Sequence, residues 1–354
     1  MKMTDADQNK PAKEAVSSVA GHPPQEEAVT PTASFQRSDQ IKPVATHRPK
    51  QWLPTEHAVR RGEWLEIIPD RSLDLERPEG RHVRMMEWLK SEAFPAKIVG
   101  LLQSRGEIQL QGDHIRLRVF PNTPYGFQPD YSYNLEVLYE DDYVLVVHKP
   151  AGMNVHPSDA NDATITLAHA VAAYYEQTGQ SCAVRHVHRL DEDTTGPVLY
   201  AKNELALYLL DEQMRSKSIH RRYVALVHGK VNERLNVIDE LIGKDRHHKQ
   251  RRRVSPGGQA AITHVQCLRT TPKASLVQLE LETGRTHQIR VHMSYVGHPL
   301  IGDTLYGGKP DLLPRQALHG EQLGFTHPWT GEPLSINDPW PADLEQAARG
   351  LKLL

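Results

Sequence analysis

Apolar residues recur at helical or alternating spacing in most of the chain after residue 56. Residues 84–90 and 95–103 carry apolar side chains at the spacing of one helix face. The next segment, 107–119, alternates apolar and polar side chains, which is typical of a hairpin. These patterns predict two short helices followed by two short strands.

The remainder of the chain predicts strands interleaved with helices. Residues 165–177 have helical spacing, and Asn203 is a suitable N-cap for a second helix that follows it. Strand patterns occur at 135–150 (two strands around an Asp-Asp turn), 197–202, 219–230 and 275–284. We therefore expect an α/β (α+β) fold with a mixed, largely antiparallel sheet.

Composition separates a tail from the folded parts. Residues 1–55 are rich in proline and mixed charge and carry few aromatic residues, so we expect a disordered N-terminal tail. The patterns beyond it predict a small N-terminal domain at 56–130, a main domain at 131–345 and a C-terminal tail at 346–354.

Charge and cysteine content narrow the possible functions. The formal net charge is -2, so binding to a polyanion would have to use local basic patches. The two cysteines, Cys182 and Cys267, are too few for a disulfide framework and are expected to be free thiols. His186 and His188 have no third ligand at a usual spacing, so no metal is expected.

Membrane and export signals are not evident in the sequence. No apolar run approaches the roughly 18 residues that span a bilayer, and the N-terminus has no apolar segment typical of a secretory signal. We expect a cytoplasmic protein.

The acidic run 188–196 (HRLDEDTTG) is the first candidate for chemistry. It falls between a predicted helix and a predicted strand, where a rigid scaffold can hold reactive groups on a loop. Taken alone, it would be interpreted as a capped turn.

This run and four other segments resemble the motifs of the RluA family of RNA pseudouridine synthases, in the family's order. The segments are VVHKPAGMNVHP (146–157), HRLDEDTTGPVLYAKN (188–203), KSIHRRYVALVHG (217–229), ETGRTHQIRVHMSYVGHPLIGDTLYG (282–307) and LHGEQLGFTHPWTGEPLSI (318–336). The resemblance implies the pseudouridine synthase fold and the isomerisation of uridine in a structured RNA.

The resemblance also implies roles for single residues. Asp191 would be the catalytic carboxylate, Arg290 its ion-pair partner, and Tyr223 a flat surface for the uracil. Thr195 stands where the family usually has serine, which keeps the hydroxyl. Gly320 stands where alanine is commoner, with no consequence evident from the sequence.

Four further residues of these motifs are expected to bind substrate: Arg189, Lys149, Arg285 and His287. The basic run at 244–253 (KDRHHKQRRR) is a second candidate RNA contact, through Arg251, Arg252 and Arg253. A solvated charged loop is the alternative interpretation of that run.

The implied reaction breaks the bond from the anomeric carbon to the base nitrogen, turns the uracil and rejoins it through carbon 5. It needs no redox partner, so no cofactor is expected. Ionised Asp191 could attack the anomeric carbon, or remove the ribose 2′ proton to give a glycal; the residues leave both routes open. The target uridine has to leave its stack to reach such a site.

The partners expected are an RNA, either large-subunit ribosomal RNA or transfer RNA, with no membrane, no nucleotide cofactor and a monomeric chain. The helices and hairpin within 56–130 resemble an alpha-L RNA-binding module, with a purely structural subdomain as the alternative. Two other functions are weighed against the synthase. One is an RNA-binding or assembly protein on the same fold without chemistry, and the other is a hydrolase that uses Asp191 and Asp193 as paired carboxylates.

Overall fold

The computed structural model describes residues 58–69, 73–90, 94–158 and 164–354. The expected disordered tail at 1–55 lies outside these residues. All pairings between named strands in the described ranges are antiparallel. The α+β class with a largely antiparallel sheet is therefore confirmed.

The first described part combines a small sheet with two helices. The predicted helices correspond to α1 (Arg81–Trp88) and α2 (Ala96–Ser104), and the predicted hairpin to β3 (Ile108–Gln111) and β4 (His114–Leu117). The sequence analysis did not identify β1 (Ala58–Arg61) or β2 (Trp64–Ile67), which extend this hairpin into a sheet of order β1-β2-β4-β3. The sequences of β1 and β2, AVRR and WLEI, do not alternate apolar and polar side chains, whereas IQLQ and HIRL in β3 and β4 do.

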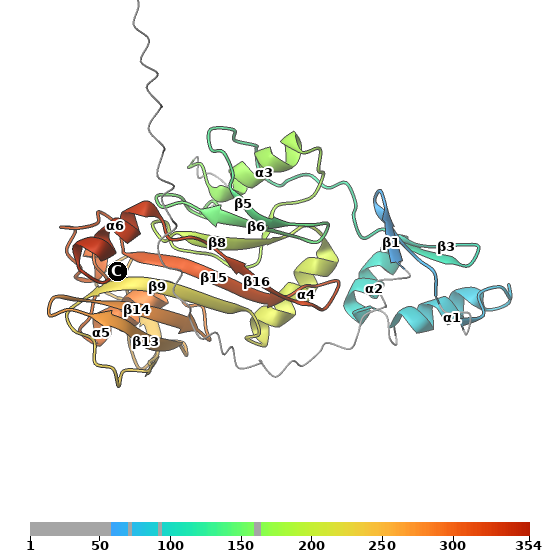
Figure 1. Ribbon diagram of the computed structural model, residues 1–354. Coiled ribbons are helices and arrows are strands. Elements are labelled where there is room, and N and C mark those ends of the chain that lie inside the picture. Colours follow the sequence, from blue (N-terminus) through green and yellow to red (C-terminus); the bar gives the residue numbers. More distant parts are fainter. Residues whose placement is uncertain (1–57, 70–72, 91–93, 159–163) are drawn as a thin grey trace, which may run out of the picture. The chain divides into compact units, whose positions relative to one another are not determined.

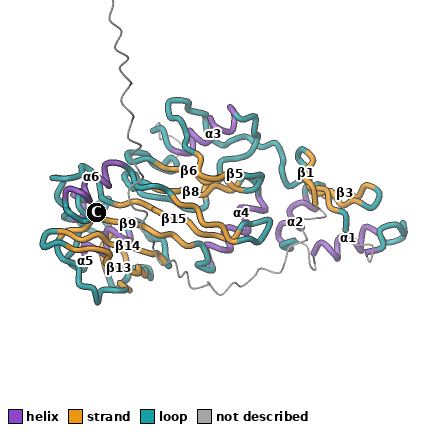
Figure 2. Tube along the Cα trace, in the orientation of Figure 1, coloured by secondary structure: helices purple, strands orange, loops and turns teal. Residues whose placement is uncertain are grey.

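The main part of the chain contains a four-stranded sheet, a six-stranded sheet and a hairpin (Figures 1 and 2). The four-stranded sheet has the order β5-β6-β8-β7 and the six-stranded sheet has the order β10-β13-β14-β9-β15-β16. The strands of the first are β5 (Val137–Glu140), β6 (Val144–Lys149), β7 (Arg185–His186) and β8 (Gly196–Ala201). Those of the second are β9 (His220–His228), β10 (Val237–Asp239), β13 (Ile262–Thr270), β14 (Ala274–Leu281), β15 (Leu318–Thr326) and β16 (Pro333–Asn337). The separate hairpin pairs β11 (Ile242–Lys244) with β12 (Arg252–Val254).

Helices cover the sheets, and two of them begin at residues whose side chains cap them. Helix α3 (Leu167–Gln177) begins at Thr166 with a capping box, and α4 (Glu204–Arg215) begins at Asn203, whose side chain accepts a hydrogen bond from Ala206 N at 2.9 Å. The other helices are α5 (Gln288–Tyr295), the 3-10 turn Thr304–Tyr306 and α6 (Ala342–Gly350). The Asn203 N-cap prediction is confirmed.

One of the two large cores joins β6 and β8 to α3 and to β9 and β14. Its fully buried members include Leu145 and Val147 on β6, Tyr175 on α3 and Val277 on β14. Burial of side chains of this size contributes roughly 1.5–3 kcal/mol each. The core therefore fixes the strand ends from which the loops of the site emerge.

The C-terminal residues differ from the expected tail. Residues 346–354 complete α6 and the turn after it, and Leu353 is fully buried beside Leu344 and Ala347. The sequence patterns had placed these residues in a tail. Its apolar residues nevertheless cover the face of the six-stranded sheet that carries Val224 and Leu226.

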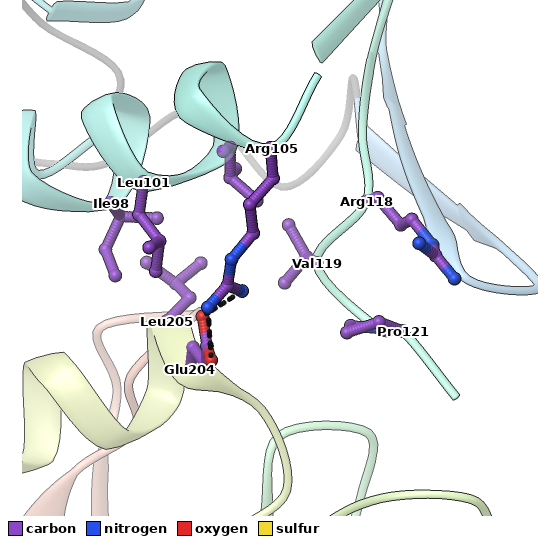
Figure 3. Close-up of a pocket in the computed structure, with 9 residues that line it drawn as sticks. Ile98, Leu101, Arg105, Arg118, Val119, Pro121, Glu204 and Leu205 are labelled. Atoms are coloured by element: carbon purple, nitrogen blue, oxygen red, sulfur yellow. Dashed lines mark hydrogen bonds and ion pairs between the residues drawn. The ribbon is translucent and has the colours of Figure 1, made fainter. Parts of the chain in front are cut away.

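Helix α2 lies against α4, where Ile98 and Leu101 approach Leu205 (Figure 3). Arg105 Nη1 and Glu204 Oε2 form an ion pair at 3.0 Å across this contact. The small hollow between the two helices is lined by none of the residues predicted to bind or convert substrate. None of the helices in the described part of the chain has the length and apolar character to cross a membrane.

The start of β8 touches the middle of β15 through two glycines. Gly196 has a φ of 138°, and a Cβ built on it would lie 2.8 Å from the Cα and N of Gly320. A Cβ on Gly320 would in turn lie 3.1 Å from Pro197 Cδ and 3.6 Å from Tyr223 Cε1. Glycine at both positions thus lets the acidic loop approach β15 at backbone distance, with Gly320 N donating to Thr195 O at 2.8 Å.

Gly196→Ala is expected to lower the free energy of unfolding by more than about 2 kcal/mol, because it adds both backbone strain and overlap with Gly320. The measurement is chemical denaturation of the full chain. Gly297→Ala is the matched control, since Gly297 also has positive φ (86°) but nothing lies within 4 Å of its Cβ position. The control should cost only about 1 kcal/mol, and equal losses in the two variants would contradict the close-approach argument.

Candidate active site

Asp191 and Arg290 meet although 99 residues separate them in the chain. Asp191 lies on the loop between β7 and β8, and Arg290 lies in the first turn of α5. Arg290 Nη1 donates to Asp191 Oδ2 at 3.2 Å, with the two side chains 9% and 19% exposed. The structure thus brings together the carboxylate and the guanidinium that the motifs single out.

A second carboxylate holds Arg290 from the other side. Arg290 Nε donates to Asp303 Oδ2 at 2.7 Å and Nη2 donates to Asp303 Oδ1 at 2.9 Å. This two-pronged pair is buried, with the Asp303 side chain 1% exposed. Asp303 therefore fixes the plane of the guanidinium and leaves Nη1 for Asp191.

The electrostatic balance of this cluster favours a permanently charged arginine. Burial acts to lower the pKa of Arg290, but the hydrogen bonds and charge of Asp303, with a further contribution from Asp191, outweigh it and raise the pKa above its ordinary value. One cation faces two carboxylates, and the carboxylate of Asp191 is the more exposed of the two. Asp191 can therefore be reached by a substrate while its orientation stays fixed.

Tyr223 is a buried aromatic residue within range of the charge of Asp191. It lies on β9, between Leu279 of β14 and Gly320 of β15, and is 5% exposed. Burial raises the pKa of its hydroxyl, the charge of Arg221 lowers it, and the charge of Asp191 raises it. The tyrosine is thus close enough to Asp191 to feel its charge.

Lys149 hydrogen-bonds to the backbone of the loop that carries Asp191. Its side chain is fully buried, and Nζ donates to the carbonyl oxygens of Pro150, Met153 and Glu192 at 2.7, 2.6 and 2.6 Å. Burial lowers the pKa of Lys149 to about 7, against the charges of the neighbouring carboxylates. The sequence analysis placed Lys149 at the substrate, whereas all three of its donors are used by the protein backbone.

The C-terminal segment holds the remainder of the same loop. Arg315 Nη1 donates to Asp193 O at 3.3 Å, and its Nε and Nη2 pair with Asp343 at the start of α6. His319 Nε2 donates to Asp338 O at 3.0 Å, so its Nδ1 accepts the Thr195 hydroxyl at 2.8 Å. A hydroxyl is therefore useful at position 195, whether serine or threonine supplies it.

Tyr306 connects the basic hairpin to Arg290. Its hydroxyl accepts from Arg252 N at 2.8 Å and donates to His287 Nδ1 at 2.8 Å, while the Arg290 guanidinium lies 5.1 Å from its ring. The Arg251 guanidinium lies 5.7 Å from the same ring. Two residues of the basic run are therefore neighbours of the site, despite their distance from it in the sequence.

His287 adopts a backbone conformation that is unusual for a side-chain-bearing residue. Its φ is 58°, at the N-cap of α5, and burial lowers the pKa of its imidazole. A neutral ring fits its role as acceptor of the Tyr306 hydroxyl. This strained residue lies three positions before Arg290 and so sets the direction in which α5 begins.

The other predicted substrate contacts lie at the surface. Arg189 and Arg253 are exposed, and Arg285 is exposed with Nε donating to Ala260 O at 3.0 Å. They can meet an RNA without moving buried groups. The sequence analysis did not single out Asp303 or Tyr306, although both lie within the quoted GDTLYG segment.

No group of three or more histidine, cysteine, aspartate or glutamate side chains arranged to hold a metal ion was found in the described ranges. His186 stacks on His156 with ring centroids 4.5 Å apart, and burial lowers its pKa to about 4. Cys182 and Cys267 are free thiols.

Comparison with known proteins agrees with this geometry. The family described as RNA pseudouridylate synthase matches residues 143–295. An uncharacterized RNA pseudouridine synthase of Bacillus subtilis, YhcT, is 40% identical over 290 residues, covering 81% of this chain and 93% of the relative. The ribosomal large subunit pseudouridine synthase D of Xanthomonas campestris is 35% identical, covering 78% of this chain and 86% of the relative.

Solved structures share the fold. Human RNA Pseudouridylate Synthase Domain Containing 4 has a TM-score of 0.52 at 23% identity, covering 61% of this chain and 93% of the solved one. Human RNA Pseudouridylate Synthase Domain Containing 1 has a TM-score of 0.51 at 26% identity, covering 61% of this chain and 87% of the solved one. The five motifs, their meeting around one carboxylate and the extent of these matches lead to one conclusion: the chain belongs to the RluA family of RNA pseudouridine synthases.

Proposed function

We propose that this RNA pseudouridine synthase uses Asp191 as its catalytic carboxylate, and that its target uridine lies in large-subunit ribosomal RNA. The observation that carries the first part is the partly exposed carboxylate of Asp191, ion-paired with the buried Arg290 that Asp303 holds from the other side. The second part is supported by relatives whose names specify the ribosomal large subunit, including those of Haemophilus ducreyi and Neisseria meningitidis.

Asp191 can act by either of two routes in this setting. As a nucleophile it would bond to the anomeric carbon while the uracil leaves, and as a base it would take the ribose 2′ proton. Both routes need an ionised carboxylate in a fixed orientation, and Arg290 Nη1 holds Asp191 Oδ2 at 3.2 Å. The ring of Tyr223 offers a flat surface on which the detached uracil can turn, and the buried surroundings keep water away.

The target is tested by mapping pseudouridines in ribosomal RNA from cells with and without the gene. Loss of one or more sites in the large-subunit RNA supports the proposal. If pseudouridines disappeared only from transfer RNA, the substrate would be transfer RNA and not ribosomal RNA, and the reaction would be the same.

Asp191→Asn is expected to abolish pseudouridine formation while leaving RNA affinity within about threefold, because the amide keeps the shape but cannot act as nucleophile or base. Nucleoside mass analysis and tritium release from carbon 5 measure the product. Asp193→Asn is the matched control two residues away and should keep most of the activity. An inactive Asp193→Asn with release of free uracil by the wild type would favour the paired-carboxylate hydrolase instead.

Arg290→Met leaves the buried carboxylate of Asp303 unpaired, which should lower the free energy of unfolding by about 3–5 kcal/mol. Activity should fall as well, because Asp191 loses its orienting partner. The measurements are chemical denaturation and the single-turnover rate. Arg105→Met, which breaks the more exposed pair with Glu204, should cost no more than about 1 kcal/mol. Similar losses in both variants would contradict the buried-pair argument.

We further propose that the hairpin of β11 and β12 contacts RNA phosphates through the cations of the 244–253 run. Its tip is exposed, including Arg246 and Lys249. Arg251, by contrast, faces Tyr306 beside Arg290. The exposed and the inner cations of the hairpin should therefore act differently.

Replacing Arg246 and Lys249 with Ala should weaken binding to every RNA tested and reduce the slope of log affinity against log salt by roughly 0.7 to 0.9 per lost contact. The single-turnover rate at saturating enzyme should stay unchanged. Arg251→Ala is the comparison, and it should also slow the single turnover because Tyr306 loses a neighbour. An unchanged salt slope in the double variant would mean that the hairpin tip is only a solvated loop.

A further inference from the structure

Three arginines are buried in the described part of the chain, and one of them differs from the other two. Arg290 and Arg315 each form a two-pronged pair with an aspartate. Arg221 is 7% exposed, yet no hydrogen bond or ion pair of its guanidinium with any described residue is found, and its Nε is buried without a partner. A buried guanidinium without an anion is unfavourable and calls for an explanation.

The position of Arg221 is next to the site. It lies on β9 two residues before Tyr223, so both side chains point to the same face of the strand, with Cα atoms about 7 Å apart. The Arg221 guanidinium also rests on the turn that leads into α5, since a Cβ on Gly284 would lie 2.8 Å from Arg221 Nη1. Gly284 thus leaves the space that the guanidinium occupies.

The charge of Arg221 acts on groups of the site. It lowers the pKa of the Tyr223 hydroxyl, on which the charge of Asp191 acts in the opposite direction. After burial itself, the charge of Arg221 is the next cause that lowers the pKa of His188, to about 3. The neutral His188 and Tyr223 offer this cation no counter-charge, and Asp191, the carboxylate that acts on Tyr223, is already paired with Arg290.

We propose that Arg221 binds a phosphodiester group of the RNA, belonging to the target uridine or to its direct neighbour. The proposal rests on the site having the function proposed above, because it places the RNA strand beside Tyr223. Phosphodiesters are the anionic groups of RNA, and a guanidinium matches their geometry with two parallel hydrogen bonds. A neutral uracil carbonyl would leave the buried charge uncompensated.

The contact would stabilise the nucleotide in its flipped-out position. The cations at the hairpin tip are exposed and attract RNA in general, whereas Arg221 can pair only with a strand that has entered the site. The energy of pairing a desolvated charge is thus available only after flipping, and it offsets part of the cost of unstacking the base.

The test measures binding of a short oligouridylate over a range of salt concentrations, because this probe requires no knowledge of the target sequence. Arg221→Met removes the charge and keeps much of the volume, Arg221→Lys keeps the charge, and Arg222→Met is the matched control on the opposite face of β9. Met at 221 should weaken affinity about tenfold or more and reduce the salt slope by about 0.7. Lys at 221 should keep the slope, and Met at 222 should keep both quantities near wild type.

Thermal unfolding of the free protein separates binding from a structural role. Removing an unpaired buried charge should leave the melting temperature of Arg221→Met equal to or above that of the wild type. A lower melting temperature with an unchanged salt slope would show a structural arginine and overturn the proposal. Weaker affinity with an unchanged slope would show a contact to an uncharged group, which overturns it as well.

These outcomes are independent of the target assignment. If the wild-type protein formed no pseudouridine in large-subunit ribosomal RNA, the proposed target would fail. The oligouridylate slopes would still decide whether Arg221 pairs with phosphate.

Discussion

The buried pair between Arg290 and Asp303 is the interaction on which the site depends. Two parallel hydrogen bonds fix the guanidinium plane, and only then does its remaining nitrogen point to Asp191. A lone arginine beside an exposed aspartate would gain little from pairing and would move between rotamers. The deeper carboxylate removes that freedom, so the orientation of Asp191 is set by a residue that a substrate need not touch.

The loop of Asp191 is constrained in a similar way along its backbone. Lys149 holds the carbonyl of Glu192, Arg315 holds that of Asp193, and His319 accepts the hydroxyl of Thr195. These supports come from the first motif and from the C-terminal segment, so distant parts of the chain converge on one short loop. The buried Lys149 and Arg315 donate hydrogen bonds to backbone carbonyls of the loop, so that donors and acceptors are both paired. These hydrogen bonds hold the loop in one conformation.

In the proposed function, the cations of the described residues fall into two groups that would serve different steps of RNA binding. Exposed side chains on the hairpin of β11 and β12 produce a field that salt screens, and this kind of attraction does not distinguish sequences. Buried arginines act at short range and need a partner of matched geometry. The Tyr306 hydroxyl lies between the two groups, in contact with the hairpin backbone and with His287. The basic hairpin is thus in direct contact with residues of the candidate active site.

The sequence by itself determined the α+β class, helices at 84–90 and 95–103, the N-cap at Asn203 and the set of residues that form the family motifs. These depend on local periodicity, on capping chemistry and on motifs whose order survives in a linear chain. The sequence could not assign the four-residue strands β1 and β2, the packing of Leu353 or the pairing of Arg290 with Asp303. Only the tertiary structure decided which of the buried arginines has a carboxylate and which does not, because burial and pairing arise between segments far apart in the chain. It also placed Arg251 and Arg252 beside the site, since Tyr306 joins two segments that the sequence keeps more than fifty residues apart.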